Sequence, residues 1–203
     1  MTLFMSKLMS GIMELLIVSV IPFITWLIWS RKKVGFFDWI GLKKVKTQQK
    51  RRLLLTIFGF SLLFLLFSII VLAWFDSSKT ATADFSGKGI GALPAILAYA
   101  ILGTALPEEI FFRGFLLKRL QRKLGFLGAN LVQSLLFGLI HGYMFIQLIG
   151  DLKAMAIFAF ISLIAFVLGA INEKKANGSI LPSVFIHALA NTVVGLLFAF
   201  SLI

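Results

Sequence analysis

Long apolar runs alternate with short polar connections along the whole chain. A helix needs about 20 apolar residues to cross the hydrocarbon core of a bilayer. Six segments come near this length, and they cover residues 11–29, 53–74, 92–117, 126–149, 154–171 and 179–203. The pattern therefore predicts an all-α, polytopic membrane protein with about six transmembrane helices.

The overall composition agrees with this interpretation. Of the 203 residues, 60% are apolar and only 14% are charged, which excludes an ordinary soluble domain. We expect a single integral membrane domain over residues 1–203. Within it, residues 1–90 would form N-terminal helices and a basic cytoplasmic loop, and residues 91–203 would form a core that carries the chemistry.

The basic residues are unevenly distributed between the connections. A net charge of +12 could indicate nucleic-acid binding, but 16 of the 20 Lys and Arg residues lie in the connections 30–52, 113–125 and 172–178. Such blocks beside apolar runs are typical of cytoplasmic loops. We therefore expect no nucleic-acid partner, both termini outside, and a prokaryotic plasma membrane. The opposite side holds Lys7, Lys79, Lys88 and Lys153.

A small set of polar residues lies within the predicted spans. Glu108, Glu109 and Arg113 belong to the third span, although an ionisable group at a helix centre costs about 2.5–3.5 kcal/mol. Both histidines of the chain also belong to this set. The other members are Asn130, Gln133, His141 and Gln147 in the fourth span, and His187 and Asn191 in the sixth.

Depth and spacing suggest that these side chains face one another. With a rise of about 1.5 Å per residue, the two glutamates lie roughly 13 Å from Leu117 and His187 lies roughly 12 Å from Ser179. The estimated depth of His141 in the membrane is somewhat greater, and a tilt of the helix can remove that difference. Residues four apart share a helix face, so each helix presents one such pair in a single direction. The pairs are Glu109 with Arg113, Phe137 with His141, and His187 with Asn191.

Two prolines bear on the ends of these helices. Pro107 has no N–H and disfavours helical geometry at Leu106, so we expect a break there and a new helix start beside the glutamates. Pro182 follows the turn sequence Asn-Gly-Ser, which indicates the start of the sixth helix.

The chemistry of the set leaves two mechanisms open. A Glu–Arg pair near a helix end is often structural, and single His or Asn residues often join membrane helices. Together they favour a hydrolytic site. Because the chain has no cysteine, a zinc ion would need His and carboxylate ligands. Without a metal, Glu108 and His141 would activate a water jointly.

Three separated motifs carry a resemblance to a known family. EExxxR stands at 108–113, FxxxH at 137–141 and HxxxN at 187–191, in this order and on three predicted spans. In these motifs the chain resembles the intramembrane proteases typified by the type II CAAX prenyl endopeptidase. Their bacterial relatives are linked to bacteriocin processing and self-immunity.

The resemblance implies an intramembrane endopeptidase with its site between the three C-terminal helices. It implies Glu108, Glu109, His141, His187 and Asn191 as the catalytic set, with Arg113 and Phe137 in support. Glu109, His141 and His187 would be the ligands if zinc binds. The chain is short for the eukaryotic enzymes, so we expect a hydrophobic peptide or a membrane-protein terminus as substrate rather than a CAAX protein.

Two other functions remain open at this point. The first is a non-catalytic membrane module, such as an immunity protein or a secretion partner, that uses the polar layer only for helix association. The second is a small transporter or proton pathway, because intramembrane Glu and His also form proton relays. Substitution of Glu108 distinguishes an enzyme from a scaffold. A pH-driven flux in liposomes would indicate a transporter.

Overall fold

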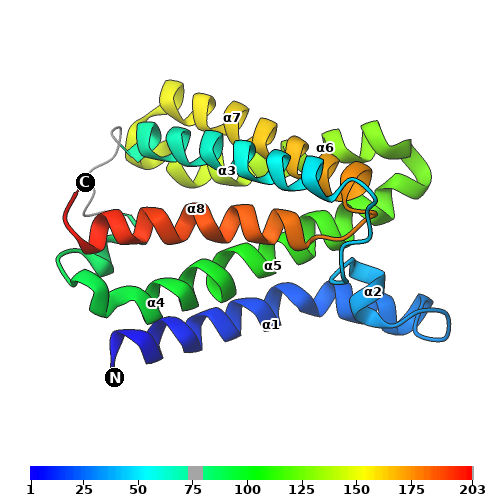
Figure 1. Ribbon diagram of the computed structural model, residues 1–203, viewed down its shortest axis with the longest axis horizontal. Helices are drawn as coiled ribbons and strands as arrows, with labels where there is room; N and C mark the ends of the chain where they lie inside the picture. The colour runs from blue at the N-terminus through cyan, green and yellow to red at the C-terminus, as the bar shows by residue number, and fades with distance from the viewer. Residues whose placement is uncertain (73–79, 203) are drawn as a thin grey trace. The chain divides into compact units, whose positions relative to one another are not determined.

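The computed structural model describes residues 1–72 and 80–202. None of these residues is in a β-strand. The α-helices are α1 Leu3–Trp29, α2 Phe36–Ile40, α3 Lys50–Leu72, α4 Leu93–Leu97, α5 Leu106–Glu109, α6 Lys118–Ile149, α7 Asp151–Ala170 and α8 Leu181–Ala199 (Figure 1). Two 3-10 turns are η2 Ala83–Phe85 and η3 Gly89–Ala92, and three π-helical segments are η4 Ala98–Ala105, η5 Ile110–Leu117 and η6 Ile171–Lys175.

The all-α, polytopic fold class is confirmed. Over the described residues, five helical stretches are long and apolar enough to cross a membrane. One of them, Gly89–Ile149, has 61 residues and contains both the third and the fourth predicted spans. The backbone leaves helical geometry within it at Gly125, where φ is 67° and ψ is 174°. Residues 73, 74 and 203 of the predicted spans, and Lys79, lie outside the described residues.

The connection predicted at 113–125 is wrong. Helix continues through η5 to Leu117 and through the first part of α6, up to the change of direction at Gly125. The segment consists mostly of Leu, Lys, Arg and Gln, which favour helix, and its only glycine before Gly125 is Gly114. Arg113 is therefore a buried helical residue and not a loop charge that sets topology.

The described chain divides into two compact units. Unit 1 consists of Met1–Ile17, Thr56–Pro107 and Val184–Ile203, and unit 2 consists of Val18–Leu55 and Glu108–Ser183. Neither unit coincides with the predicted parts 1–90 and 91–203. The single membrane domain stays a prediction, and we describe each unit by itself.

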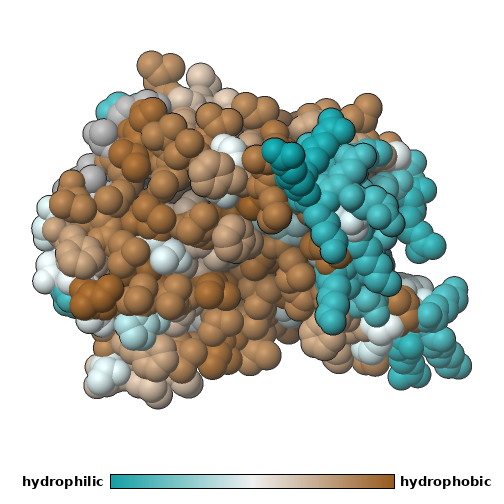
Figure 2. Space-filling model, in the orientation of Figure 1, coloured by the Kyte–Doolittle hydropathy of each residue, from teal (hydrophilic) through white to brown (hydrophobic). Residues whose placement is uncertain are grey.

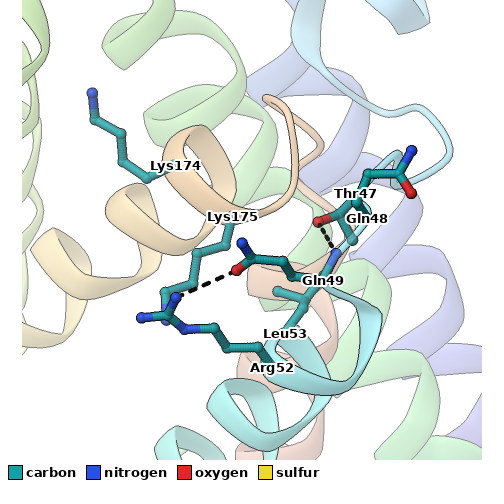
Figure 3. Close-up of a pocket in the computed structure, with 7 residues that line it drawn as sticks. All are labelled: Thr47, Gln48, Gln49, Arg52, Leu53, Lys174 and Lys175. Atoms are coloured by element: carbon teal, nitrogen blue, oxygen red, sulfur yellow. Dashed lines mark hydrogen bonds between the residues drawn. The ribbon is translucent and has the colours of Figure 1, made fainter.

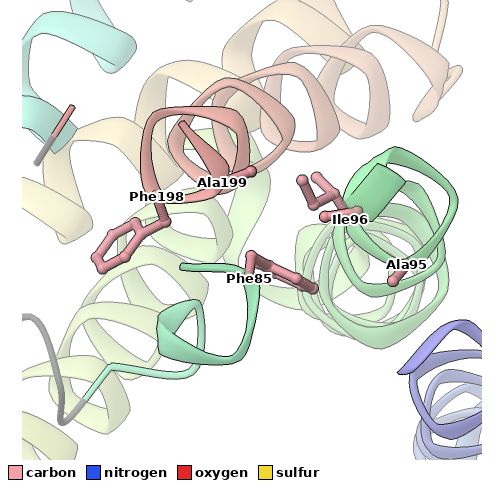
Figure 4. Close-up of a cluster of buried hydrophobic side chains, with 6 residues drawn as sticks. Phe85, Ala95, Ile96, Phe198 and Ala199 are labelled. Atoms are coloured by element: carbon pink, nitrogen blue, oxygen red, sulfur yellow. The ribbon is translucent and has the colours of Figure 1, made fainter. Parts of the chain in front are cut away.

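Unit 1 has a core of small and aromatic side chains from η2, α4 and the end of α8. Phe85, Ala95 and Ile96 are buried there with Phe198 and Ala199 (Figure 4). Gly195 permits the close approach of α8 to α4, because a Cβ atom at this position would lie 2.7 Å from Cγ2 of Ile96. Small residues at such crossings are typical of membrane helices.

Unit 2 is built around the packing of α7 on α6. The side chain of Asn130 donates a hydrogen bond to the carbonyl of Phe166 at 2.8 Å, and Gln133 donates to the carbonyl of Ala165 at 3.2 Å. Both polar side chains are fully buried. Asn130 and Gln133, which the sequence placed among the polar residues at membrane depth, therefore join two helices.

The basic stretches of unit 2 are tied to one another. Lys118 donates to the carboxylate of Glu173 and, at 2.8 Å, to the carbonyl of Gly178. Ser179 donates to the carbonyl of Lys43 at 2.6 Å. These contacts bring the basic stretches 30–52, 113–125 and 172–178 together. In Figure 2, hydrophilic side chains gather over α2 and the loop that leads to α3.

The turn before α8 agrees with its predicted chemistry. Asn177 and Gly178 have φ values of 53° and 74°, a left-handed conformation that Asn and Gly tolerate. Helix α8 begins at Leu181, so Pro182 stands in its first turn. The prediction of a helix start at this place is confirmed.

Substitution of two glycines tests the α6–α7 packing. A Cβ atom at Gly138 would lie 2.6 Å from the carbonyl oxygen of Phe158, whereas one at Gly59 on α3 would meet nothing within 4 Å. We expect Gly138→Ala to lower the free energy of unfolding by about 1–3 kcal/mol because the helices must separate. Gly59→Ala should keep or raise stability. Thermal unfolding of the detergent-solubilised protein measures both, and equal melting temperatures for Gly138→Ala and wild type would contradict this packing.

Candidate functional site

The two adjacent glutamates stand between two π-helical segments. Segment η4 precedes α5 and η5 follows it, and Leu106 has φ −67° and ψ −50°. The prediction of a break at Pro107 is therefore wrong, because the backbone stays helical. In the π-helical turns each N–H bonds five residues back instead of four. Such segments are frequent at functional sites.

Glu109 forms a buried ion pair with Arg113. Atom Nη1 of Arg113 lies 3.0 Å from Oε1 of Glu109, and both side chains are fully buried. The guanidinium carbon of Arg113 also lies 4.4 Å from the ring centre of Phe137 on α6. Removal of one partner of a buried pair leaves an uncompensated charge, which typically costs 3–5 kcal/mol. The contact of Arg113 with Phe137 links this pair to α6.

Glu108 lies beside His141 and is more exposed than Glu109. Oε2 of Glu108 is 4.0 Å from Nε2 of His141, and the side chains keep 28% and 23% of their surface. Nδ1 of His141 lies 2.8 Å from the carbonyl oxygen of Phe137. A carbonyl can only accept, so Nδ1 carries the hydrogen and Nε2 of the neutral ring is an acceptor that faces Glu108.

The distance between these two acceptors suits one water molecule. A water that donates two hydrogen bonds of about 2.8 Å joins acceptors about 4.4 Å apart. The carboxylate of Glu108 and the imidazole of His141 lie close to this spacing, and Oε2 of Glu108 is itself buried. A carboxylate beside an imidazole is a pair of groups that can take a proton from a water in hydrolysis.

Phe137 fixes the orientation of the groups around it. Its ring contacts that of Phe112 in a T-shaped arrangement at 4.8 Å and that of His141 at 4.3 Å. Together with Ala165 of α7, Phe112 and Phe137 form a buried cluster. The aromatic ring thus lies between the imidazole and the guanidinium. Its contacts are those of a supporting residue.

The third motif lies in unit 1. His187 on α8 is 7% exposed, and its ring lies 6.1 Å from that of Phe64 on α3. Nδ2 of Asn191 donates to Oγ1 of Thr104 at 2.8 Å, and Thr104 donates to the carbonyl of Ala100 at 2.9 Å. Thr104 was not among the candidate site residues selected from the sequence. Its only signal there is a hydroxyl in an apolar run, four residues before Glu108.

The structure therefore brings the first two motifs together and leaves the third in the other unit. Unit 2 holds Glu108, Glu109, Arg113, Phe137 and His141 in mutual contact. Unit 1 holds His187 and Asn191, with Thr104 as a partner of Asn191.

The donors within one unit do not fit a catalytic zinc. Within the described residues of either unit, no three His, Asp or Glu side chains gather closely enough to hold a metal ion. Unit 2 offers Glu108 and His141, while the carboxylate of Glu109 binds Arg113. A catalytic zinc takes three protein ligands. Zinc held by Glu109, His141 and His187 stays a prediction that requires both units.

Comparison with known proteins agrees with the three motifs. The model of a protein family described as type II CAAX prenyl endopeptidase Rce1-like matches residues 90–193, just over half of the chain. All three motifs fall within this range. No curated protein and no solved structure matches the chain. The chain thus belongs to the type II CAAX prenyl endopeptidase Rce1-like family and is a multi-pass membrane protein of the intramembrane endopeptidase class.

Proposed function

We propose that this protein hydrolyses a peptide bond in a hydrophobic or membrane-associated peptide, with Glu108 and His141 activating the water. The observation that carries the proposal is the 4.0 Å approach of Nε2 of His141 to Oε2 of Glu108. The hydrogen bond of Nδ1 to Phe137 makes Nε2 the acceptor at this point. A carboxylate and an imidazole in this relation can hold one water and take its proton.

The proposed reaction has two proton transfers. The oxygen of the water attacks the carbonyl carbon of the scissile bond, and Glu108 takes a proton from the water at the same time. The carbonyl double bond opens to an oxyanion, which an N–H of Asn191 stabilises. Collapse of the intermediate then breaks the C–N bond, and the proton on Glu108 passes to the leaving amine. The roles of His187 and Asn191 in this proposal rest on the three-motif pattern and on the family match.

The two adjacent glutamates have different roles in this mechanism. Glu109 is fully buried and bound to Arg113, so it positions the helix that carries Glu108. Glu108 is partly exposed, so it can meet a substrate, and its buried Oε2 atom faces His141. Different environments commonly separate the roles of two neighbouring carboxylates.

Zinc remains part of the proposal as a possible cofactor. Glu109, His141 and His187 would hold it, and the metal would polarise the substrate carbonyl and lower the pKa of a bound water. The steps above use only side chains of the chain and do not depend on the metal.

The biological setting follows the family's bacterial relatives. We infer maturation of a bacteriocin or signal peptide, or self-immunity, in a prokaryotic plasma membrane with the basic loops in the cytoplasm. The alternative is a non-catalytic immunity or secretion-partner module. The pairing of Glu108 with His141 favours the enzyme, because helix association does not require a partly exposed acid–base pair.

Substitution of Glu108 tests the proposed base. Glu108→Gln keeps the size of the side chain but cannot accept the proton, so cleavage should fall at least about 100-fold. The assay uses liposomes that contain the protein and two fluorescent peptides, one farnesylated with a CAAX-type end and one unmodified and apolar. The control is Glu14→Gln, at an exposed glutamate on α1. A folded Glu108→Gln protein that cleaves at the wild-type rate would refute the role of Glu108.

Metal analysis tests the zinc proposal. Detergent-purified protein, prepared without chelator, should contain about one zinc per chain. Because His141 and His187 are proposed ligands, His141→Ala and His187→Ala should each lose the metal while keeping a cooperative thermal transition. A folded wild type without zinc would rule out the metal site but leave the Glu108–His141 mechanism standing.

Thr104 should act as a positioning residue for Asn191. Thr104→Val removes the hydroxyl that accepts from Asn191, and loss of one hydrogen bond should lower kcat by about tenfold. KM should change little, because the hydroxyl is not proposed to bind substrate. Thr104→Ser should restore kcat. A valine variant with full kcat, or a serine variant as slow as valine, would exclude this role.

A further inference from the structure

A basic pocket lies in unit 2, outside the catalytic set. Its lining comes from the segment before α3, the first turn of α3 and η6 (Figure 3). We call it the basic pocket, and its residues are Thr47, Gln48, Gln49, Arg52, Leu53, Lys174 and Lys175. The hollow has a volume of about 500 Å³, which includes space open to solvent. The proposed reaction uses none of these residues.

The pocket exists because two distant segments are tied together. Ser179 donates to the carbonyl of Lys43, and the N–H of Ile180 donates to the carbonyl of Gly41 at 2.8 Å. These bonds hold the chain after η6 against the segment that leads into α3. Basic side chains separated by more than 120 residues in the sequence therefore meet around one hollow.

The lining has the chemistry of an anion site. None of its seven residues is acidic, and three carry a positive charge. The nearest acidic residue in the sequence, Glu173, is bound by Lys118 and so is engaged elsewhere. Two glutamine amides and a threonine hydroxyl add neutral donors. Guanidinium and ammonium groups beside such donors are the usual partners of phosphate oxygens.

The positions of the three cations single out two of them. The Nζ atom of Lys174 lies 4.4 Å from the ring centre of Phe126, and in Figure 3 its side chain extends away from the others. Nη1 of Arg52 lies 3.4 Å from Oε1 of Gln49, which directs the guanidinium along the pocket wall. Arg52 and Lys175 also line the pocket, and we assign them as the residues that contact an anion.

The surface beside the pocket indicates where such an anion comes from. Directly after Arg52, helix α3 becomes apolar, and Leu54 and Leu55 of unit 2 are 65% and 62% exposed. An apolar, exposed helix of this length faces lipid tails. The basic pocket thus lies at the level where a membrane-spanning helix emerges into the headgroup region, where basic clusters attract anionic lipids.

We propose that the basic pocket binds a phosphate group, and that within the membrane this group belongs to the headgroup of an anionic phospholipid. The phosphate contacts Arg52 and Lys175, and the acyl chains lie against Leu54 and Leu55 of α3. The ligand would hold the segment before α3 against η6. This proposal does not depend on the proposed peptidase activity.

Lipid titration of matched variants tests the site. The full-length protein in a neutral detergent is titrated with short-chain phosphatidylglycerol, and bound lipid is counted by native mass spectrometry. The pocket variant Arg52→Gln/Lys175→Gln should bind at least tenfold more weakly than wild type. The control Arg31→Gln/Lys32→Gln removes the same charge from exposed residues of unit 2 outside the pocket, and it should bind like wild type. Equal affinities for pocket variant and wild type, or equal losses in both variants, would overturn the proposal.

A second arm distinguishes the two sources of phosphate. The same protein is titrated with inorganic phosphate and with glycerol 3-phosphate, neither of which has acyl chains. At least tenfold weaker binding than phosphatidylglycerol supports a lipid ligand. Soluble phosphate that binds as tightly as the lipid, with the same dependence on Arg52 and Lys175, would overturn the lipid as ligand and leave a site for a soluble phosphate compound.

Discussion

The ion pair between Glu109 and Arg113 is the interaction on which the site in unit 2 depends. Both side chains are fully buried, so each charge is stable there only because the other is present. Arg113 also lies on the ring of Phe137, and that ring contacts the imidazole of His141. The helix that carries Glu108 is therefore connected, through this pair and an aromatic ring, to the histidine that faces Glu108.

The packing of α6 and α7 supports this arrangement from the other side. Asn130 and Gln133 bond to backbone carbonyls of α7, and Ala165 of α7 completes the cluster around Phe137. Polar side chains in a bilayer must satisfy their hydrogen bonds within the protein. The hydrogen bonds that hold α7 on α6 thus also keep Ala165 against the ring of Phe137. A rigid support of this kind is what a pair of acid–base groups needs to hold one water.

Some features of the fold and the site could be predicted from the sequence, and others could not. The apolar runs predicted the helices well, because a bilayer demands long uninterrupted spans. The i,i+4 spacing of Glu109 and Arg113 predicted their contact, and the Asn-Gly-Ser turn predicted the start of α8. The break at Pro107 and the connection at 113–125 were wrong. Propensity rules assume α-helical geometry, and the π-helical turns around α5 lie outside that assumption.

The sequence by itself determined the membrane class, the spans and the three motifs, since these depend on composition and on spacing along single helices. Only the tertiary structure decided which neighbouring glutamate is buried and which faces His141. It also assigned Asn130 and Gln133 to helix packing, paired Thr104 with Asn191, and gathered Arg52 and Lys175 around one pocket. The reason is physical: burial and pairing between residues far apart in the chain depend on how helices approach one another, and local sequence does not encode that approach.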